Sequence, residues 1–381
     1  MDVSVSDHSV AGVTVGPSTG PGTGHATSTP DRGIAAESSA DARQSQAILS
    51  SKSLTAAMAK VGTCGLSATS VAYIISATGS SPAIYRPGVS ASATRVCPDI
   101  KAVADVTNTS SAITSMWAWG NPVPASVDAR GLGEPAFVPA AISAFSAAKH
   151  LTDVRLSVPW AADTGSQVRA WLAGSVSAIH TSGQTVSALG GDNGWVAQPA
   201  LAVQWMTAAH SVAPFNGVQL DVEPWTDDAG WVNHPAAIAS YIALVQQSEA
   251  AAHVLGMKLG LDVPWWLSTT PYGSGSVLSA LLPFIDSVSI VAYSDHAGSS
   301  DGIIAQAWPA VVETTAARVP FTIGVQTSSD AISGGAQYTF ADKGSAILET
   351  ETAKVRAAYS TTLGYSGVTV EEYLSWSTLK P

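Results

Sequence analysis

Eight short segments rich in β-branched and aromatic residues recur along the chain, and alanine-rich segments lie between them. The expected strands are 112–120, 153–160, 185–191, 217–225, 258–266, 287–295, 320–327 and 367–373. Several of the intervening segments are helix-like and end in glycine, a common helix terminator. This alternation, repeated eight times over about 270 residues, predicts an α/β fold, a closed (β/α)8 TIM barrel. An open doubly wound sheet is the alternative, but no glycine-rich dinucleotide loop follows the first strand.

The part of the chain before the barrel has a different composition. Residues 1–48 lack aromatic residues and apolar periodicity, so we expect a disordered low-complexity leader. Residues 49–110 are expected to form a small N-terminal extension, and residues 111–381 the barrel domain. The extension holds the only two cysteines, Cys64 and Cys97, which could pair or remain two small apolar side chains.

Charge and composition exclude several partners. Lys and Arg total 17 against 28 Asp and Glu, and the net charge of -11 would repel nucleic acid and anionic lipid. Residues 61–85 are uncharged, but Ser, Thr and Gly interrupt them, so we do not expect a membrane span. Met1 is not followed by a standard signal peptide, although the Ser, Thr, Ala and Gly bias is common in exported bacterial proteins. We expect an extracellular or cell-envelope monomer.

Acidic residues end the fourth expected strand. In "FNGVQLDVEPW", Gln219, Asp221 and Glu223 occupy every second position, with successive Cα atoms about 6.6–6.8 Å apart on one face. On the outer face, packed helices would impose a desolvation cost of several kcal/mol on each acid, which favours the lumen. Two adjacent carboxylates in a partly dry pocket raise the pKa of one of them, which leaves a general acid near neutral pH. A buried ion pair with Arg155 or Lys258 is the alternative.

Other candidates follow the remaining strands, where barrel enzymes collect their chemistry. The polar candidates for substrate binding are Gln219, Asp192, Asp262, Asp295, Glu371 and Glu372. Only one of the adjacent residues Glu371 and Glu372 can face the lumen, because side chains alternate along a strand. The aromatic candidates are Trp117, Trp119, Trp160, Trp195, Trp225, Trp265 and Trp376. Their flat faces suit stacking on sugar rings, and packing at the barrel mouth is the alternative.

Three motifs lie on the third, fourth and sixth expected strands. They are "SALGG" with Ser187, Gly190 and Gly191, "NGVQLDVE" ending in Glu223, and "VAYSD" with Tyr293 and Asp295. Together they resemble the chitinase-like glycoside hydrolases of family 18, and "LDVEPW" and "LDVPWW" also resemble uncharacterised bacterial barrel proteins of the wider glycosidase superfamily. The resemblance implies that Glu223 protonates the glycosidic oxygen, while Asp221 and Tyr293 orient a substrate N-acetyl group that attacks the anomeric carbon. Gln219 replaces an acid of the motif and cannot exchange a proton with Asp221.

These residues predict a retaining glycoside hydrolase that cleaves a polysaccharide or an N-acetylhexosamine-containing glycan. A second catalytic route would use an enzyme carboxylate as nucleophile, with Glu371, Glu372, Asp262 or Asp295 opposite Glu223. A non-catalytic carbohydrate-binding barrel is the third hypothesis, favoured by Gln219. No cofactor or metal is expected, because no histidines pair at HxH or HxxxH spacing.

Overall fold

The structure, a computed structural model, describes residues 112–381. Eight parallel strands close into a barrel, in the order β1, β10, β9, β8, β5, β4, β3, β2 around the ring. The strands are β1 (Ile113–Ala118), β2 (Asp153–Ser157), β3 (Thr185–Gly190), β4 (Gly217–Leu220), β5 (Lys258–Pro264), β8 (Ser287–Val291), β9 (Phe321–Gln326) and β10 (Tyr365–Glu371). The predicted (β/α)8 barrel is confirmed. Seven strands lie inside their expected ranges, and β10 begins two residues early.

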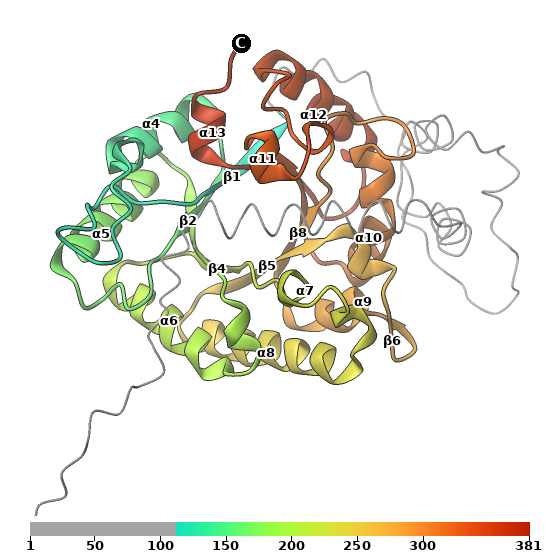
Figure 1. Cartoon of the computed structure of the whole chain (residues 1–381), viewed down its shortest axis with the longest axis horizontal. Helices are drawn as coiled ribbons and strands as arrows, with labels where there is room; N and C mark the ends of the chain where they lie inside the picture. Colours follow the sequence, from blue (N-terminus) through green and yellow to red (C-terminus); the bar gives the residue numbers. More distant parts are fainter. Residues whose placement is uncertain (1–111) are drawn as a thin grey trace, which may run out of the picture.

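Helices surround the barrel on all sides (Figure 1), with α4 and α5 on the left, α6 and α8 below, α9 and α10 on the right and α12 above. The longer helices are α4 (Pro139–Ala148), α5 (Ser166–Thr181), α6 (Pro199–Val212), α8 (Pro235–Val254), α10 (Ile303–Ala317) and α12 (Ser345–Tyr359). The short ones are α7 (Pro224–Asp227), α9 (Val277–Leu281), α11 (Asp330–Ser333) and α13 (Tyr373–Ser377). A proline at the first position of α4, α6 and α8 suits a helix start, where its missing N–H is not needed.

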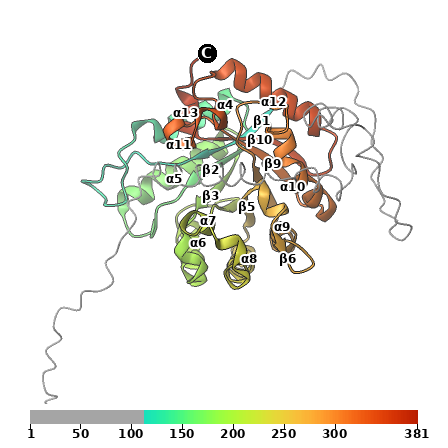
Figure 2. The same ribbon diagram turned by 45° about the vertical axis from the view of Figure 1, so that its right-hand side comes forward.

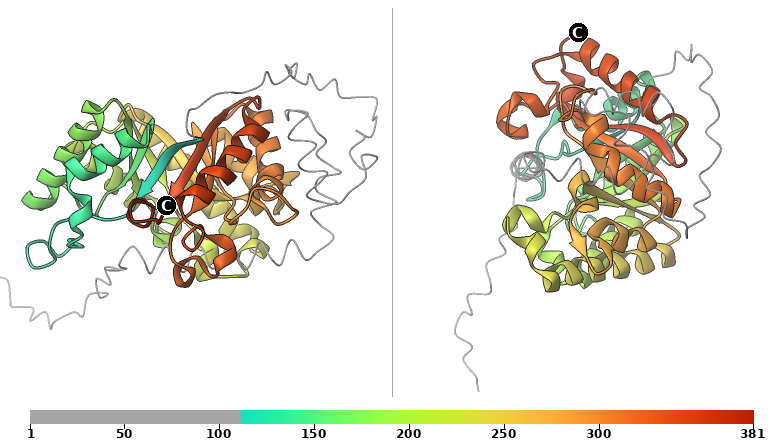
Figure 3. Two further views of the ribbon diagram at one scale, coloured as in Figure 1. Left: turned by 90° about the horizontal axis from the view of Figure 1, so that it is seen from above. Right: turned by 90° about the vertical axis from the view of Figure 1, so that its right-hand side faces the viewer.

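The ring closes between the first and last strands. Ser115 of β1 is in register with Thr369 of β10, and the two strands lie side by side in Figure 3, left, in cyan and red. After β5, the chain forms the hairpin of β6 (Pro271–Tyr272) and β7 (Gly275–Ser276) before α9. Figure 2 shows α6, α8 and α9 along one side of the barrel. The helices therefore cover the outer surface and leave the ends of the strands for chemistry.

Alternation along the strands separates an apolar outer face from a polar lumen. Val154 and Leu156 of β2 are fully buried in the main hydrophobic core, and Arg155 between them faces the lumen. In β4, Val218 and Leu220 likewise belong to the core, with Gln219 facing inward. The side-chain period of two therefore determines which residues the lumen receives.

Several sequence predictions concern segments outside the described residues. These are the domains 1–48 and 49–110, Cys64 and Cys97, and the uncharged segment 61–85. The domain boundaries and the state of the cysteines stay predictions. Between residues 112 and 381, no helix has the length and apolar character needed to cross a membrane.

Candidate active site

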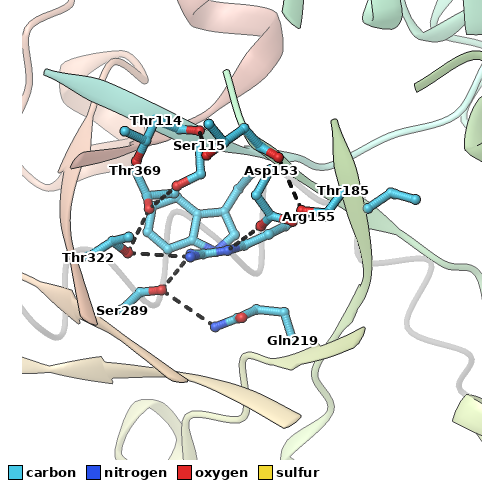
Figure 4. A network of polar contacts seen from close by, with 12 residues as sticks. Thr114, Ser115, Asp153, Arg155, Thr185, Gln219, Ser289, Thr322 and Thr369 are labelled. Atoms are coloured by element: carbon cyan, nitrogen blue, oxygen red, sulfur yellow. Dashed lines mark hydrogen bonds and ion pairs between the residues drawn. The ribbon is translucent and has the colours of Figure 1, made fainter. Parts of the chain in front are cut away.

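A polar network crosses the lumen beneath the carboxyl ends of the strands, the rim that we call the mouth (Figure 4). Its centre is Arg155, which lies 3.4 Å from Asp262 of β5 and 3.6 Å from Asp153 at the start of β2. The same guanidinium donates hydrogen bonds to Ser289 of β8 and, at 3.3 Å, to Thr322 of β9. One side chain therefore connects strands on opposite sides of the ring.

Gln219 and Trp117 complete this network around Asp262. The amide of Gln219 donates to Asp262 at 2.8 Å, and the indole of Trp117 donates to its other oxygen at 2.9 Å. Burial raises the pKa of Asp262, while the charge of Arg155 and hydrogen bonds, including those from Trp117 and Gln219, oppose the rise. Arg155, considered from the sequence as an ion-pair partner of Asp221 and Glu223, thus pairs with Asp262 and Asp153. Lys258, the other cation considered, lies exposed at the start of β5.

Two lumen-facing glycines make room for these large side chains. A Cβ at Gly260 of β5 would overlap the amide oxygen of Gln219. A Cβ at Gly324 of β9 would lie 3.0 Å from the ring of Trp117, tighter than an ordinary contact. Trp117 also stacks against Arg155, whose Cζ is 4.8 Å from the ring centroid.

At the mouth, Tyr293 and Glu371 are joined. The hydroxyl of Tyr293, two residues beyond β8, donates a hydrogen bond to the carboxylate of Glu371 at the end of β10. Burial raises the pKa of Tyr293 well above its ordinary value, and the negative charges of Glu371, Asp221 and Glu223 raise it further. The tyrosine therefore remains protonated and keeps donating to Glu371, within the electrostatic reach of all three carboxylates.

The neighbouring residue Glu372 has a different role. Its carboxylate accepts hydrogen bonds from the backbone N–H groups of Leu374 and Ser375, at 3.1 Å and 3.2 Å, and so caps the N-terminus of α13. The peptide bond between Glu371 and Glu372 is cis. Of the two adjacent acids, Glu371 is the one that reaches the lumen.

The loop after β3 fixes the segment that carries Glu223. The side-chain oxygen of Asn193 accepts a hydrogen bond from the backbone N–H of Glu223 at 2.9 Å, and its amide nitrogen donates to Thr226 at 2.9 Å. Thr226 donates in turn to the carbonyl of Glu223 at 2.7 Å. Glu223 itself is buried, with 4% of its surface exposed, just before α7.

Asp221 is fixed by the second glycine of "SALGG". The N–H of Asp221 donates to the carbonyl of Gly190 at 3.1 Å, and a Cβ at Gly191 would overlap the carbonyl of Asp221. Asp221 is half-buried, more open than Glu223. The close approach of the two strand ends thus depends on the missing side chain at Gly191.

A second tyrosine, on the helix side, also lies within reach of these acids. Burial raises the pKa of Tyr241 of α8 well above its ordinary value, and the charges of Glu223, Asp221 and Asp262 add to the rise. Its ring packs edge-on against Trp225 and Trp231, at 5.9 Å and 5.7 Å between centroids. Asp221 and Glu223 therefore act electrostatically on both Tyr241 and Tyr293.

The candidate tryptophans divide into two groups. Trp117, Trp195, Trp225, Trp265 and Trp376 are buried, and several pack edge-on or tilted against other aromatic rings. Trp119 and Trp160 are half-buried. Packing, the alternative left open by the sequence, fits the burial of the first group. Sugar stacking stays a prediction for all seven, and Trp119 and Trp160 suit it best.

The remaining polar candidates lie near the rim with local partners. Asp192 is exposed and caps a short 3-10 helix by accepting from the N–H of Gly194 at 2.7 Å. The carboxylate of Asp295 lies 2.6 Å from Nδ1 of His296 and 3.3 Å from Nζ of Lys343. Their binding to substrate stays a prediction. Within the described range, no cluster of three or more His, Cys, Asp or Glu could hold a metal ion.

Comparison with known proteins finds weak similarity to solved structures. No family model matches the chain, and no curated protein matches it. Among solved structures, catalytic domain 2 of a group II chitinase from Ostrinia furnacalis aligns at 13% identity and TM-score 0.35, over 46% of this chain and 56% of that one. A family 18 chitinase from Pseudoalteromonas aurantia aligns at 11% identity and TM-score 0.43, over 69% and 94%. The spore cortex-lytic enzyme of Bacillus megaterium aligns at 11% identity and TM-score 0.36, over 56% of this chain and 50% of that enzyme. The chain thus spans little more than half the length of the first of these structures.

Proposed function

We propose that this protein is a glycoside hydrolase with Glu223 as its general acid. The observation that carries the proposal is the hydrogen bond from Tyr293 to Glu371 at the mouth, where the charges of Glu371, Asp221 and Glu223 all raise the pKa of the tyrosine. Carboxyl groups at the mouth of a parallel barrel can protonate a glycosidic oxygen and stabilise an oxocarbenium-like transition state. Of the two acids that follow β4, Asp221 and Glu223, Glu223 is the more buried, which suits the role of a proton donor.

The substrate-assisted route assigns Asp221 and Tyr293 to the substrate N-acetyl group. In this route the acetamido oxygen attacks the anomeric carbon as the glycosidic bond breaks, and Glu223 gives its proton to the leaving oxygen. Gln219 takes no part in a proton relay, because its amide donates to Asp262. Asp221 would then stabilise the acetamido nitrogen without exchanging a proton with residue 219.

The hydrogen bond between Tyr293 and Glu371 favours a second route. A tyrosine that donates to a carboxylate orients it, and the hydroxyl of Tyr293 orients Glu371 at the mouth in this way. Glu371 would form a bond to the anomeric carbon as the glycosidic bond breaks, with the proton of Glu223 going to the leaving oxygen. Water deprotonated by Glu223 would then release the sugar and regenerate Glu371.

The variant Glu223→Gln tests the proposal directly. Release of reducing ends from N-acetylglucosamine and glucose oligomers should fall by about 10²–10⁴-fold, because the amide has no proton to give. The far-UV circular dichroism and melting temperature should match those of the parent protein. Unchanged hydrolysis would remove Glu223 from the chemistry, and tight binding without turnover by the parent protein would favour a carbohydrate-binding barrel.

The two routes differ in what becomes covalently attached. A 2-deoxy-2-fluoro glycoside slows the breakdown of a glycosyl-enzyme, so mass spectrometry should find a sugar on the peptide that contains Glu371 if the second route operates. With substrate assistance, the protein stays unlabelled, and substrates that lack an N-acetyl group are not cleaved. A location outside the cell or in its envelope, as proposed from composition, would bring such an enzyme to polymeric substrate.

A further inference from the structure

Gln326, the last residue of β9, is a buried polar side chain that the proposed chemistry does not use. Its side chain is fully buried, and neither its amide nitrogen nor its amide oxygen has a hydrogen-bond partner among the described residues. Leaving a buried polar group unsatisfied costs about 1–3 kcal/mol. A fully buried amide with two unsatisfied atoms therefore calls for a partner from outside the described fold.

The strand directs this amide into the lumen. Thr322 of β9 binds Arg155 and Gly324 faces Trp117, both inside the barrel, so Gln326 two residues further on faces the same way. The outward positions between them are apolar and belong to the core. Gln326 thus lies on the lumen face, at the level of the mouth.

Its two neighbours are the joined pair of the candidate active site. Gln326 is in register with Glu371 on β10, and Tyr293 follows two residues after Val291, the register partner of Gly324. The hydrogen bond from Tyr293 to Glu371 therefore spans the strand end that carries Gln326. A sugar bound against Glu371 would come within reach of the amide.

We propose that Gln326 is a substrate-binding residue that recognises a neutral sugar substituent with a hydrogen-bond donor and an acceptor side by side. An amide offers the complementary pair, an N–H donor and a carbonyl acceptor, and carries no charge. Two sources share this chemistry, a pair of ring hydroxyls and an acetamido group. An anionic sugar is disfavoured, because the carboxylate of Glu371 is the register neighbour of Gln326, while Arg155 is held by Asp262 and Asp153.

The inference rests on the proposed function, and Gln326→Met tests it separately. Methionine has a similar length and no polar group to bury, so the variant should melt at the same temperature as the parent or higher. A residue kept only for packing or folding would not combine unchanged stability with weaker binding. Calorimetry in a Glu223→Gln background, where hydrolysis does not interfere, should show binding of chitotetraose or cellotetraose weakened by about 5- to 100-fold.

The two probes separate the two sources of the contact. A larger loss for chitotetraose than for cellotetraose indicates the acetamido group, and equal losses indicate ring hydroxyls. Gln306→Met is the matched control, since Gln306 is also buried but lies on α10 and donates to the carbonyl of Asp301 at 2.6 Å. It should lower the melting temperature and leave both affinities unchanged.

Three outcomes would overturn the inference. These are binding unchanged within twofold in Gln326→Met, a fall in melting temperature that accompanies weaker binding, and tighter binding of tetragalacturonate than of either neutral probe. Failure of the proposed function looks different, because full hydrolysis by Glu223→Gln would reject the general acid without bearing on Gln326. The affinities of the parent and of Gln326→Met would then be compared with thio-linked tetraoses, which are not hydrolysed.

Discussion

The hydroxyl of Tyr293 donates to the carboxylate of Glu371 and thereby joins the ends of β8 and β10. Replacing Tyr293 by Phe removes this donor and leaves the ring. We expect kcat to fall by about 10–10³-fold with a smaller change in KM, because a group that acts on the transition state affects turnover more than ground-state binding.

The control for this variant is Tyr359→Phe. The hydroxyl of Tyr359 donates to the carbonyl of Ile304 at 2.7 Å, outside the barrel lumen. Its loss should cost about 1 kcal/mol of stability and leave kcat unchanged. Since the pKa of Tyr293 is raised, the parent protein should show no loss of activity from its ionisation up to pH 10. Equal kcat values in parent and Tyr293→Phe would contradict the role.

Gly191→Ala tests the approach of β3 to Asp221. The new Cβ would overlap the carbonyl of Asp221, so the backbone must move by some tenths of an ångström or more. We expect kcat/KM to fall by about 10²-fold, a loss typical of a displaced catalytic group, with a loss of stability of about 1–3 kcal/mol. Gly174→Ala on α5 is the control, because its Cβ would meet Pro139 at an ordinary 3.5 Å. Equal losses of kcat/KM in Gly191→Ala and Gly174→Ala would show that activity does not depend on the missing side chain at Gly191.

Arg155→Met tests the network in the lumen. It leaves Asp262 and Asp153 without their buried cation, and we expect urea denaturation to show a loss of about 3–5 kcal/mol. Adding Asp262→Asn should recover part of that loss, because the two residues interact directly. Lys149→Met, which removes an exposed contact with Glu349 at 3.9 Å, should cost under about 1 kcal/mol. Additive effects of Arg155→Met and Asp262→Asn would show that the pair is not coupled.

Glu313 on α10 should make stability depend on pH. Burial raises its pKa from 4.5 to about 7, although Ser276 donates to its carboxylate at 2.6 Å. The folded protein therefore holds the proton more tightly than the unfolded chain does. This contribution to stability is complete below pH 4.5 and is lost as pH rises to about 7.

Denaturation of the parent and of Glu313→Gln at pH 4.5 and pH 8 measures this contribution. Between these pH values the parent should lose about 2 kcal/mol more than the variant, allowing for solvent screening. Glu349→Gln, at an exposed position on α12, serves as the control and should follow the parent. The same pH slope in parent and Glu313→Gln would rule out an effect of Glu313.

The barrel could be predicted because its signals are local. Each strand combines β-branched residues with a period of two, and the same period sends Gln219 and Arg155 to the lumen. Strand β4 ends at Leu220, earlier than expected, since residues 221–223 lie outside the strand and Pro224 then begins α7. Residue pattern alone does not show where a strand stops hydrogen bonding.

Partners across the ring could not be predicted. Arg155 meets Asp262 from a position 107 residues away, and no periodicity relates the two. The burial of each tryptophan cannot be predicted from the sequence either, so the sequence does not separate packed tryptophans such as Trp265 from half-buried ones such as Trp160. Asn193 and Tyr241 were missed as neighbours of Glu223, although Asn193 stands directly after Asp192 at a strand end, which was a usable signal.

The adjacent acids that end β10 tie the mouth to the C-terminal turn of the chain. Glu371 faces Tyr293, while Glu372 caps α13, whose Trp376 meets Phe145 of α4 at 5.0 Å between centroids. Because Glu372 is anchored by capping α13, deleting the residues after it should loosen the adjacent residue Glu371. Truncation after Glu372 is therefore expected to disturb the candidate active site.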